Sequence, residues 1–101
     1  MSITTIGPKD TAENKVVEFP FEDELATAET ITSASVGITV VSGTDPSPSS
    51  MLVGVPVVVG TSVLQRIAGG IAGVTYHLRA TADSSVGGVH VVATDLKVVT
   101  L

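Results

Sequence analysis

The segment VTYHLRATA, residues 74–82, constrains the fold most strongly because its apolar and polar side chains alternate. One face would carry Val74, Tyr76, Leu78 and Ala80, and the other face would carry mainly polar residues. A period of two places successive side chains on opposite faces of a β-strand, whereas an amphipathic helix needs a period of about 3.6. We therefore predict a half-buried strand in this segment.

The composition extends this prediction to the whole chain. Among its 101 residues, 18 are valine, 13 are threonine and only three are aromatic. Side chains that branch at Cβ are stiff and pack well on a pleated surface. A chain of this length forms one domain around one core. We predict an all-β fold, an immunoglobulin-like antiparallel β-sandwich of about seven strands.

Local signals place the first strands. In KVVEFPF, residues 15–21, apolar side chains alternate, and Pro20 suits an edge strand because proline cannot donate to the ladder. The segment EDELATAE, residues 22–29, favours about two helical turns between the first two strands. TITSAS and GITVVSG, residues 30–35 and 37–43, are short and β-branched, which predicts two further strands.

The second half of the chain predicts the remaining strands. MLVGVPVVVG, residues 51–60, is apolar on both faces, and Pro56 forbids a continuous central ladder there. DSSVGG, residues 83–88, is typical of a hairpin turn between the last two strands. The predicted core comprises Val17, Phe19, Ile31, Ile38, Val40, Val63, Tyr76, Leu78 and Ala80.

The charge is distributed unevenly along the chain. Residues 1–29 hold seven acidic residues against Lys9 and Lys15, which accounts for the formal net charge of −5. An acidic balance without a basic stripe argues against nucleic acid as a partner. Residues 1–14 are polar and show no apolar period, so we predict an extended N-terminal arm followed by a β-sandwich domain, residues 15–101. We expect this arm to order on a neighbour and to add little to the stability of the isolated domain.

Several features bear on the compartment. The chain contains no cysteine, so it forms no disulfide and offers no thiolate. Its first residues lack the basic flank and apolar stretch of a signal peptide. Proline and glycine interrupt the most apolar region, residues 51–64, which is also shorter than the roughly 20 residues of a membrane helix. We expect folding in a cytoplasm and no membrane partner.

A glycine-rich turn precedes the strand at residues 74–82. A phosphate-binding loop would need a helix directly after the glycines, because the helix N-terminus supplies the amides that bind the anion. A strand follows here instead, which favours a structural corner formed by Gly70, Gly73 and Tyr76. In such a tyrosine corner the phenol hydroxyl bonds to backbone a few residues upstream.

No set of residues predicts a catalytic, cofactor or metal site. Pairing of the last two strands would place His77 opposite Thr94 and His90 opposite Thr81, so the two histidines do not meet. Without cysteine or a nearby carboxylate on the same face, a zinc site would lack its third and fourth ligands. We interpret both histidines as surface or interface residues.

Two segments are candidate docking elements. The acidic turn at Glu22, Asp23 and Glu24 lacks the spacing of a calcium loop, and it is better explained as a solvated patch for docking. The valine run is either a strand buried on both faces or a strand that contacts a neighbouring subunit. The second interpretation makes Val55, Val57 and Val59 docking residues.

Two blocks of the sequence resemble a family of small virion proteins. VEFPFEDELATAETITSA is similar to the acidic-aromatic strand, leucine-containing turn and Glu-Thr-Ile strand start of the fiber-tail adaptors of tailed bacteriophages. GGIAGVTYHLRATADSSVGG is similar to their glycine-tyrosine corner, strand and hairpin. The chain lacks the tryptophan that the family commonly places after the first strand, and its middle carries no resemblance.

The resemblance implies a structural protein of the virion without enzymatic activity. Its partners would be other virion proteins of the tail, connector, fiber or capsid, together with further copies of itself. Assembly would take place in the cytoplasm of the host bacterium. Two alternatives remain open, namely a capsid decoration protein and a carbohydrate-binding or adhesion module. The second has only three aromatic residues, all at predicted core positions, for stacking on sugars.

Overall fold

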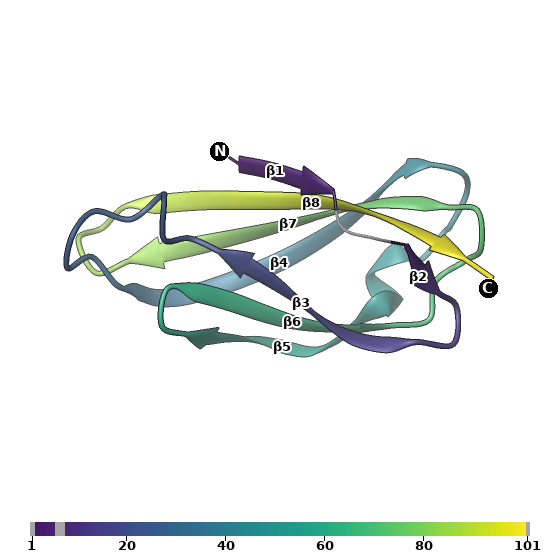
Figure 1. Cartoon of the computed structure of the whole chain (residues 1–101), viewed down its shortest axis with the longest axis horizontal. Helices are drawn as coiled ribbons and strands as arrows, with labels where there is room; N and C mark the ends of the chain where they lie inside the picture. The colour runs from purple at the N-terminus through teal and green to yellow at the C-terminus, as the bar shows by residue number, and fades with distance from the viewer. Residues whose placement is uncertain (1, 6–7, 101) are drawn as a thin grey trace.

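Two β-sheets form an elongated sandwich of about 42 × 22 × 22 Å in the computed structural model, which describes residues 2–5 and 8–100 (Figure 1). The smaller sheet contains β3 (Asn14–Pro20), β5 (Leu52–Val59) and β6 (Ser62–Ala68). The larger sheet contains β1 (Ser2–Thr5), β2 (Lys9–Asp10), β4 (Ile31–Ser42), β7 (Thr75–Ser84) and β8 (Val89–Val99). A 3₁₀ turn, η1 (Pro48–Met51), precedes β5.

The sheet orders confirm the predicted β-sandwich. The small sheet has the antiparallel order β3-β6-β5, and the large sheet runs β1-β8-β7-β4. β1 and β2 both pair in parallel with β8, so they act as one interrupted edge strand and bring the total to seven. This parallel edge departs from the antiparallel arrangement that the sequence predicts. β4 and β5, the last strands of the two sheets, lie next to each other along one flank.

The core lies between the two sheets and follows the period-two pattern. Seven of the nine predicted core residues are buried, and Ile31 and Val40 are partly buried against the same cluster. The buried apolar residues are Val17, Phe19, Phe21, Ile38, Met51, Val63, Ile67, Val74, Tyr76, Leu78, Ala80, Ala82, Val92, Ala93, Leu96 and Val98. Because buried side chains alternate with outward ones on β3, β6 and β7, one close-packed layer fills the sandwich.

Two local predictions were wrong. Residues 22–29 form turns and not two helical turns: the Leu25 N–H donates to the Phe21 carbonyl, but Ala28 has φ +68° and the helix does not continue. Residues 31–42 form one long strand where two short ones were expected. Gly37 interrupts the β-branched pattern but not the ladder, in which it pairs with Arg79.

The N-terminal arm is extended but lies on its own chain. β1 pairs with residues 92–95 and β2 with residues 98–99, so the arm covers an edge of β8 that would otherwise expose unpaired backbone groups. The Lys9 side chain is buried, and its Nζ donates to the carbonyls of Gly69 and Asp10 at 2.7 and 2.8 Å. The expectation that the arm orders only on a neighbour overlooked backbone pairing, which needs no apolar period. Whether residues 15–101 are stable without the arm remains a prediction.

In the described part of the chain, no helix has the length and apolar character that crossing a membrane requires.

Candidate docking surfaces

The tyrosine corner joins two loops at one end of the sandwich. The Tyr76 side chain is fully buried at the start of β7, and its hydroxyl oxygen accepts a hydrogen bond from the Ile71 N–H at 3.0 Å. The same hydroxyl donates to the Asp45 carboxylate at 2.7 Å. Burial, followed by the contact with Asp45, raises the pKa of Tyr76 above its usual value. The turn that contains Gly70 and Gly73 thus leads into a strand, and the Tyr76 hydroxyl holds this turn to the loop that contains Asp45.

Gly70 has a strict steric reason to be glycine. Its φ is +98°, and a Cβ there would lie 2.8 Å from Val98 Cγ2 and 3.1 Å from Met51 Cε. Gly73 also has a positive φ, +87°, but no atom lies within 4 Å of the position of its Cβ. The two glycines of the predicted corner therefore serve different purposes. Gly70 allows close packing, and Gly73 allows only the left-handed backbone that L-residues rarely adopt.

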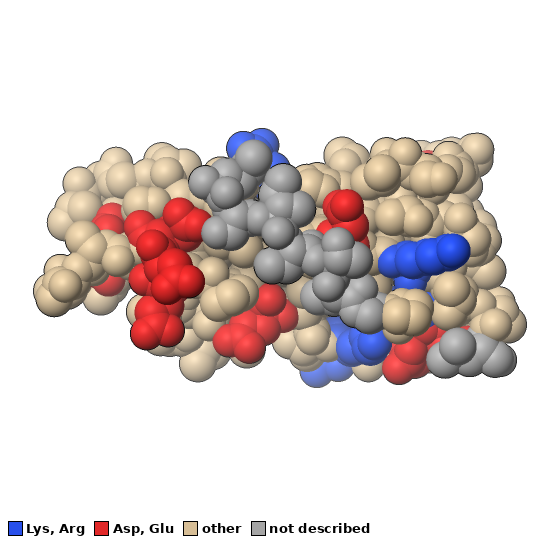
Figure 2. Space-filling model, turned by 45° about the horizontal axis from the view of Figure 1, so that its top comes forward, with Lys and Arg blue, Asp and Glu red and all other residues tan. Residues whose placement is uncertain are grey.

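The opposite end of the molecule is acidic. The β3–β4 connection brings Glu22, Asp23, Glu24 and Glu29 together, and Asp83 lies at the end of β7 beside them. We call these five residues the acidic end. The chain has ten acidic and five basic residues, so the acidic end accounts for the whole net charge of −5. Figure 2 shows red spheres and no blue ones at its left-hand end, whereas both colours occur farther right.

The acidic end does not coincide with the acidic stretch of sequence. Asp10 and Glu13 lie at the far end of β3, where Glu13 forms an ion pair with Lys15 at 3.9 Å. Asp83 comes from 60 residues beyond Asp23 in the sequence, and its carboxylate accepts a hydrogen bond from the Ser33 hydroxyl. The sequence analysis therefore found Glu22, Asp23 and Glu24 but missed Asp83. The hairpin signal at residues 83–88 was the available clue, because a hairpin must end near another connection.

A buried carboxylate anchors the acidic connection to the β7–β8 hairpin. Glu29 is 8% exposed, and its Oε2 lies 3.1 Å from His90 Nε2. Its Oε1 accepts a hydrogen bond from the Ala26 N–H at 2.8 Å. Hydrogen bonds from the Ser84 hydroxyl, the Ala26 amide and His90 lower the pKa of Glu29 from 4.5 to about 2. These contacts fix the shape of the acidic end.

The histidines occupy different places from those predicted. His77 pairs with Asp95, and its Nδ1 lies 2.7 Å from the Asp95 carboxylate, while His90 pairs with Ala82. The predicted register was one residue off, and it would have put the outward His77 opposite the buried Thr94. Both histidines are partly exposed and each has one carboxylate partner. Within residues 2–5 and 8–100, no three His, Asp or Glu side chains gather as a metal site would require.

The outer face of the small sheet is mostly apolar. It carries Val16 on β3, Leu64 on β6, and Val53, Val57 and Val59 on β5, and the three strands place these residues side by side. With Val55 they form what we call the valine face. Val55, Val57 and Val59, the predicted docking residues, are 82%, 54% and 55% exposed. β5 is therefore not buried on both faces, which leaves the subunit-contact interpretation of this strand.

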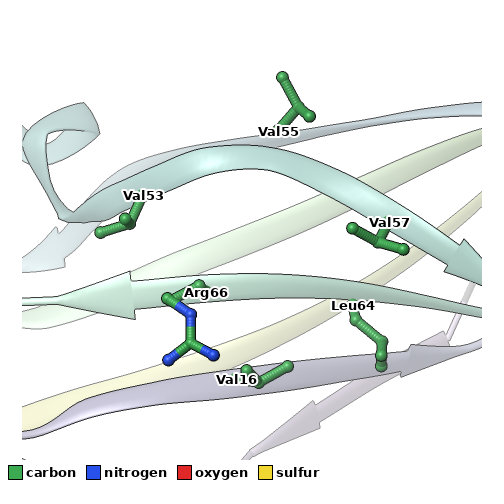
Figure 3. A pocket seen from close by; sticks show the side chains of 6 residues that line it. All are labelled: Val16, Val53, Val55, Val57, Leu64 and Arg66. Atoms are coloured by element: carbon green, nitrogen blue, oxygen red, sulfur yellow. The ribbon is translucent and has the colours of Figure 1, made fainter.

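A bulge in β5 shapes the valine face. The ladder with β6 breaks between Val53 and Val57, where Pro56 has no N–H to donate and Gly54 has φ +71°. The buried Gln65 amide fills the gap, because its Nε2 donates to the Arg66 carbonyl at 2.9 Å and lies within 3.4 Å of the Val53 and Gly54 carbonyls. The bulge lifts Val55 away from the sheet (Figure 3).

A shallow groove of about 310 Å³ crosses the valine face between β5 and β3. Its lining residues are Val16, Val53, Val55, Val57, Leu64 and Arg66. Figure 3 shows Val53 and Val57 pointing down from β5, Arg66 and Leu64 directed toward β3, and Val55 pointing away from the other five. The Arg66 Nη1 donates to the Asn14 side-chain oxygen at 2.9 Å. An apolar groove with a single guanidinium suits a protein surface better than a small polar substrate.

Sequence reasoning missed Arg66, Leu64 and Glu18 as parts of this face. Each alternates with a buried residue in its strand, so the period-two pattern placed them outside. Their adjacency to the valine run depends on β6 lying between β3 and β5, which the sequence does not specify. Exposed apolar residues on three paired strands form a continuous patch only after that pairing is known.

One comparison with known proteins identifies a family. Residues 9–97 match the family described as podophage GP4 fiber-tail adaptor protein gp77. The chain belongs to this family. No curated protein and no solved structure matches the chain.

Family membership confirms the resemblance found in the sequence. The match includes both resembling blocks and also the middle of the chain, including the valine run, for which the sequence analysis found no counterpart. The adaptor is thus a structural component of a phage tail, and its all-β sandwich is a scaffold for contacts. This role is favoured over the decoration and adhesion alternatives. An adaptor can contact its partners through two surface features, the acidic end and the valine face. The Tyr76 corner is a feature of the loops at the other end of the sandwich.

Proposed function

We propose that this protein is an adaptor between tail fibers and the tail that catalyses no reaction, and that it contacts its neighbours in the particle through two separate docking surfaces, the acidic end and the valine face. The separation of these surfaces is the observation that carries the proposal. The acidic end accounts for the whole net charge, and the valine face lies on the outside of the smaller sheet. Two surfaces of different chemistry allow an adaptor to bind two neighbours at once, because each neighbour, whether another virion protein or another copy of the adaptor, is recognised without competing for the other site.

The acidic end suits a basic surface on another virion protein. Glu22, Asp23 and Asp83 are exposed, whereas Glu29 is buried and holds the connection in shape. Exposed charges of one sign steer the approach of a partner of opposite sign, and they act mainly on the association rate. The same argument makes the interaction sensitive to salt, since the screening length is about 8 Å at physiological ionic strength. We propose that this encounter takes place in the virion, after folding in the host cytoplasm.

The experiment compares two charge variants in binding to tail particles that lack the adaptor. Glu22→Gln combined with Asp23→Asn removes two negative charges from the acidic end. The matched control, Ser49→Lys combined with Thr100→Lys, makes the same change in net charge at exposed positions near the opposite end. We expect the first variant to associate several-fold more slowly at low salt and to approach the wild-type rate at physiological salt.

The control variant separates local from overall charge. It should associate nearly as fast as the wild-type protein if the acidic end makes the contact. Equal slowing in both variants would mean that only net charge matters. Unchanged association of the acidic-end variant would place the charged contact elsewhere on the molecule.

A further inference from the structure

The valine face raises the question of what covers it. Val16, Val53, Val57 and Val59 are each at least 40% exposed, and they form one patch with Leu64 across three paired strands. Single apolar residues on a surface are ordinary, but contiguous patches mark contact sites. Val41, Ile71, Val86 and Val89 are also exposed, but they lie outside this sheet on β4, the β6–β7 loop and the β7–β8 hairpin.

The edge of β5 is a poor place for a partner strand. The bulge between Val53 and Val57 interrupts the regular spacing of backbone groups, and Pro56 offers no N–H. Bulges and prolines are the usual devices that prevent a strand from being added at a sheet edge. A partner must therefore approach over the face of the sheet, where the side chains are, and not along its edge.

Two opposite charges lie on this face in neighbouring rows. Arg66 pairs with Val16 in the ladder, and Glu18 pairs with Leu64 one row away. Among the described residues the two charges form no ion pair with each other or with any other residue. Each is held by a neutral neighbour: the Ser62 hydroxyl donates to Glu18 Oε2 at 2.7 Å, and Arg66 donates to Asn14. The face thus presents one positioned anion and one positioned cation within an apolar surface.

We infer that the valine face is covered by a second copy of this chain, related by a two-fold axis that lies above the sheet and parallel to it, runs perpendicular to the line from Glu18 to Arg66 and crosses over the midpoint of that line. Such an axis places Glu18 of each copy against Arg66 of the other, so both charges find partners at once. In an isologous contact, whatever residue i does to residue j is repeated by symmetry. The inference rests on the proposed function in one respect, since it names the partner of one of the two docking surfaces.

The shapes and charges of the face support this occupant. Val57 and Val59 are 54% and 55% exposed on this face, and the groove offers a hollow of about 310 Å³, so each copy supplies both exposed apolar side chains and a recess (Figure 3). The acidic end of another copy is a worse match, because it offers partners for Arg66 but leaves Glu18 facing like charges. The face is small, three strands spaced about 4.8 Å apart, so we expect weak association of the isolated protein that strengthens when copies are held together on a particle.

The test exchanges the two charges and mixes the variants. Arg66→Glu makes the face wholly acidic, and Glu18→Arg makes it wholly basic. Sedimentation velocity over a concentration series would follow self-association of the full chain. We expect each variant alone to dimerise roughly tenfold or more weakly than the wild type, because like charges then meet at the contact. An equimolar mixture should form heterodimers at least as well as the wild type forms homodimers.

Matched controls keep a failure interpretable. Val57→Ser should weaken the dimer, whereas Val86→Ser, at an exposed position on the β7–β8 hairpin, should leave it unchanged. Thermal melts would show that every variant is folded. A wild type that stays monomeric at all concentrations, or a mixture that does not associate, overturns the inference. Neither result bears on the acidic end, whose binding to tail particles is measured separately with the Glu22 and Asp23 variants.

Discussion

The hydroxyl of Tyr76 donates a 2.7 Å hydrogen bond to the carboxylate of Asp45, which lies 31 residues earlier in the chain. The same oxygen accepts the N–H of Ile71, so one buried phenol connects the loop before η1 with the turn before β7. Neither loop has a strand ladder of its own in these residues. The Tyr76 side chain thus helps to order this end of the sandwich, together with the Gly73 N–H, which donates to the Val98 carbonyl, and the Lys9 ammonium, which donates to the Gly69 carbonyl.

Removing this hydroxyl should destabilise the fold. Tyr76→Phe leaves the Ile71 amide and the Asp45 carboxylate without their partner, and we expect a loss of about 1 to 3 kcal/mol in the free energy of unfolding. Denaturant melts would measure it. Asp45→Asn should cost less, and the double variant should cost less than the sum because the two residues share one hydrogen bond. A Tyr76→Phe variant as stable as the wild type would contradict the structural role of the Tyr76 hydroxyl.

The two adjacent glycines before β7 should respond differently to alanine. Gly69 has φ +70° with no atom within 4 Å of the position of its Cβ, so Gly69→Ala should cost only the backbone strain of about 1 to 2 kcal/mol. Gly70→Ala adds an overlap with Val98 and Met51 and should cost clearly more. Thermal unfolding of both variants provides the comparison. Equal losses would mean that the side chains around Gly70 move aside freely.

Glu29 should make the stability depend on acid pH. Its pKa in the folded protein, about 2, lies below the unfolded value of 4.5, so the ionised group stabilises the fold fully above pH 4.5. That contribution is lost as the pH falls from 4.5 toward 2. Glu29→Gln should flatten this part of the profile of melting temperature against pH. Ser84→Ala removes the hydroxyl that contributes most to lowering the pKa of Glu29 and should reduce the same dependence. A profile identical to that of the wild type in both variants would contradict the assignment.

The N-terminal arm should be separable from the sandwich at a cost. Deleting residues 2–14 removes β1, β2 and the Lys9 ammonium that caps the Gly69 carbonyl, so the melting temperature should fall by several degrees. The transition should remain cooperative, because every buried apolar residue of the described core lies between Val17 and Val98. Lys9→Met in the full-length chain isolates the contribution of the capped carbonyl. A truncated chain that shows no cooperative transition would make the arm an integral part of the domain.

The predictable part of the fold was the part encoded by local alternation. Phe19, Tyr76, Leu78 and Ala80 were placed in the core because each lies on the apolar side of a period-two strand, and all four are buried. Periodicity is a local property, so it survives whatever the strand is paired with. A different local signal, helix propensity, failed for the acidic connection at residues 22–29, where it predicted about two helical turns. The chain uses Glu29 to reach His90, and that tertiary contact overrides a weak local preference.

Most contacts between segments far apart in the chain were not predicted from the sequence. The register of β7 and β8 was predicted one residue off, although the alternation of Leu96 and Val98 with Asp95 and Lys97 could have fixed it, because buried residues of paired strands must share a face. The parallel pairing of the arm with β8 left no local mark, since backbone hydrogen bonds do not require particular side chains. The hydrogen bond from Tyr76 to Asp45 was not predictable from the sequence either, because the two residues lie 31 positions apart.

The sequence by itself determined the all-β class, the inward faces of the strands and the family resemblance, because composition and alternation act within a few residues of each position. Only the tertiary structure decided which charges and apolar residues meet. Asp83 joins Glu22 and Asp23 because the β7–β8 hairpin ends beside the β3–β4 connection. Glu18 and Arg66 share the valine face because β6 lies between β3 and β5. Surfaces are assembled from segments far apart in the chain, and their proximity is set by strand order, which depends on packing of the whole domain and not on any one segment.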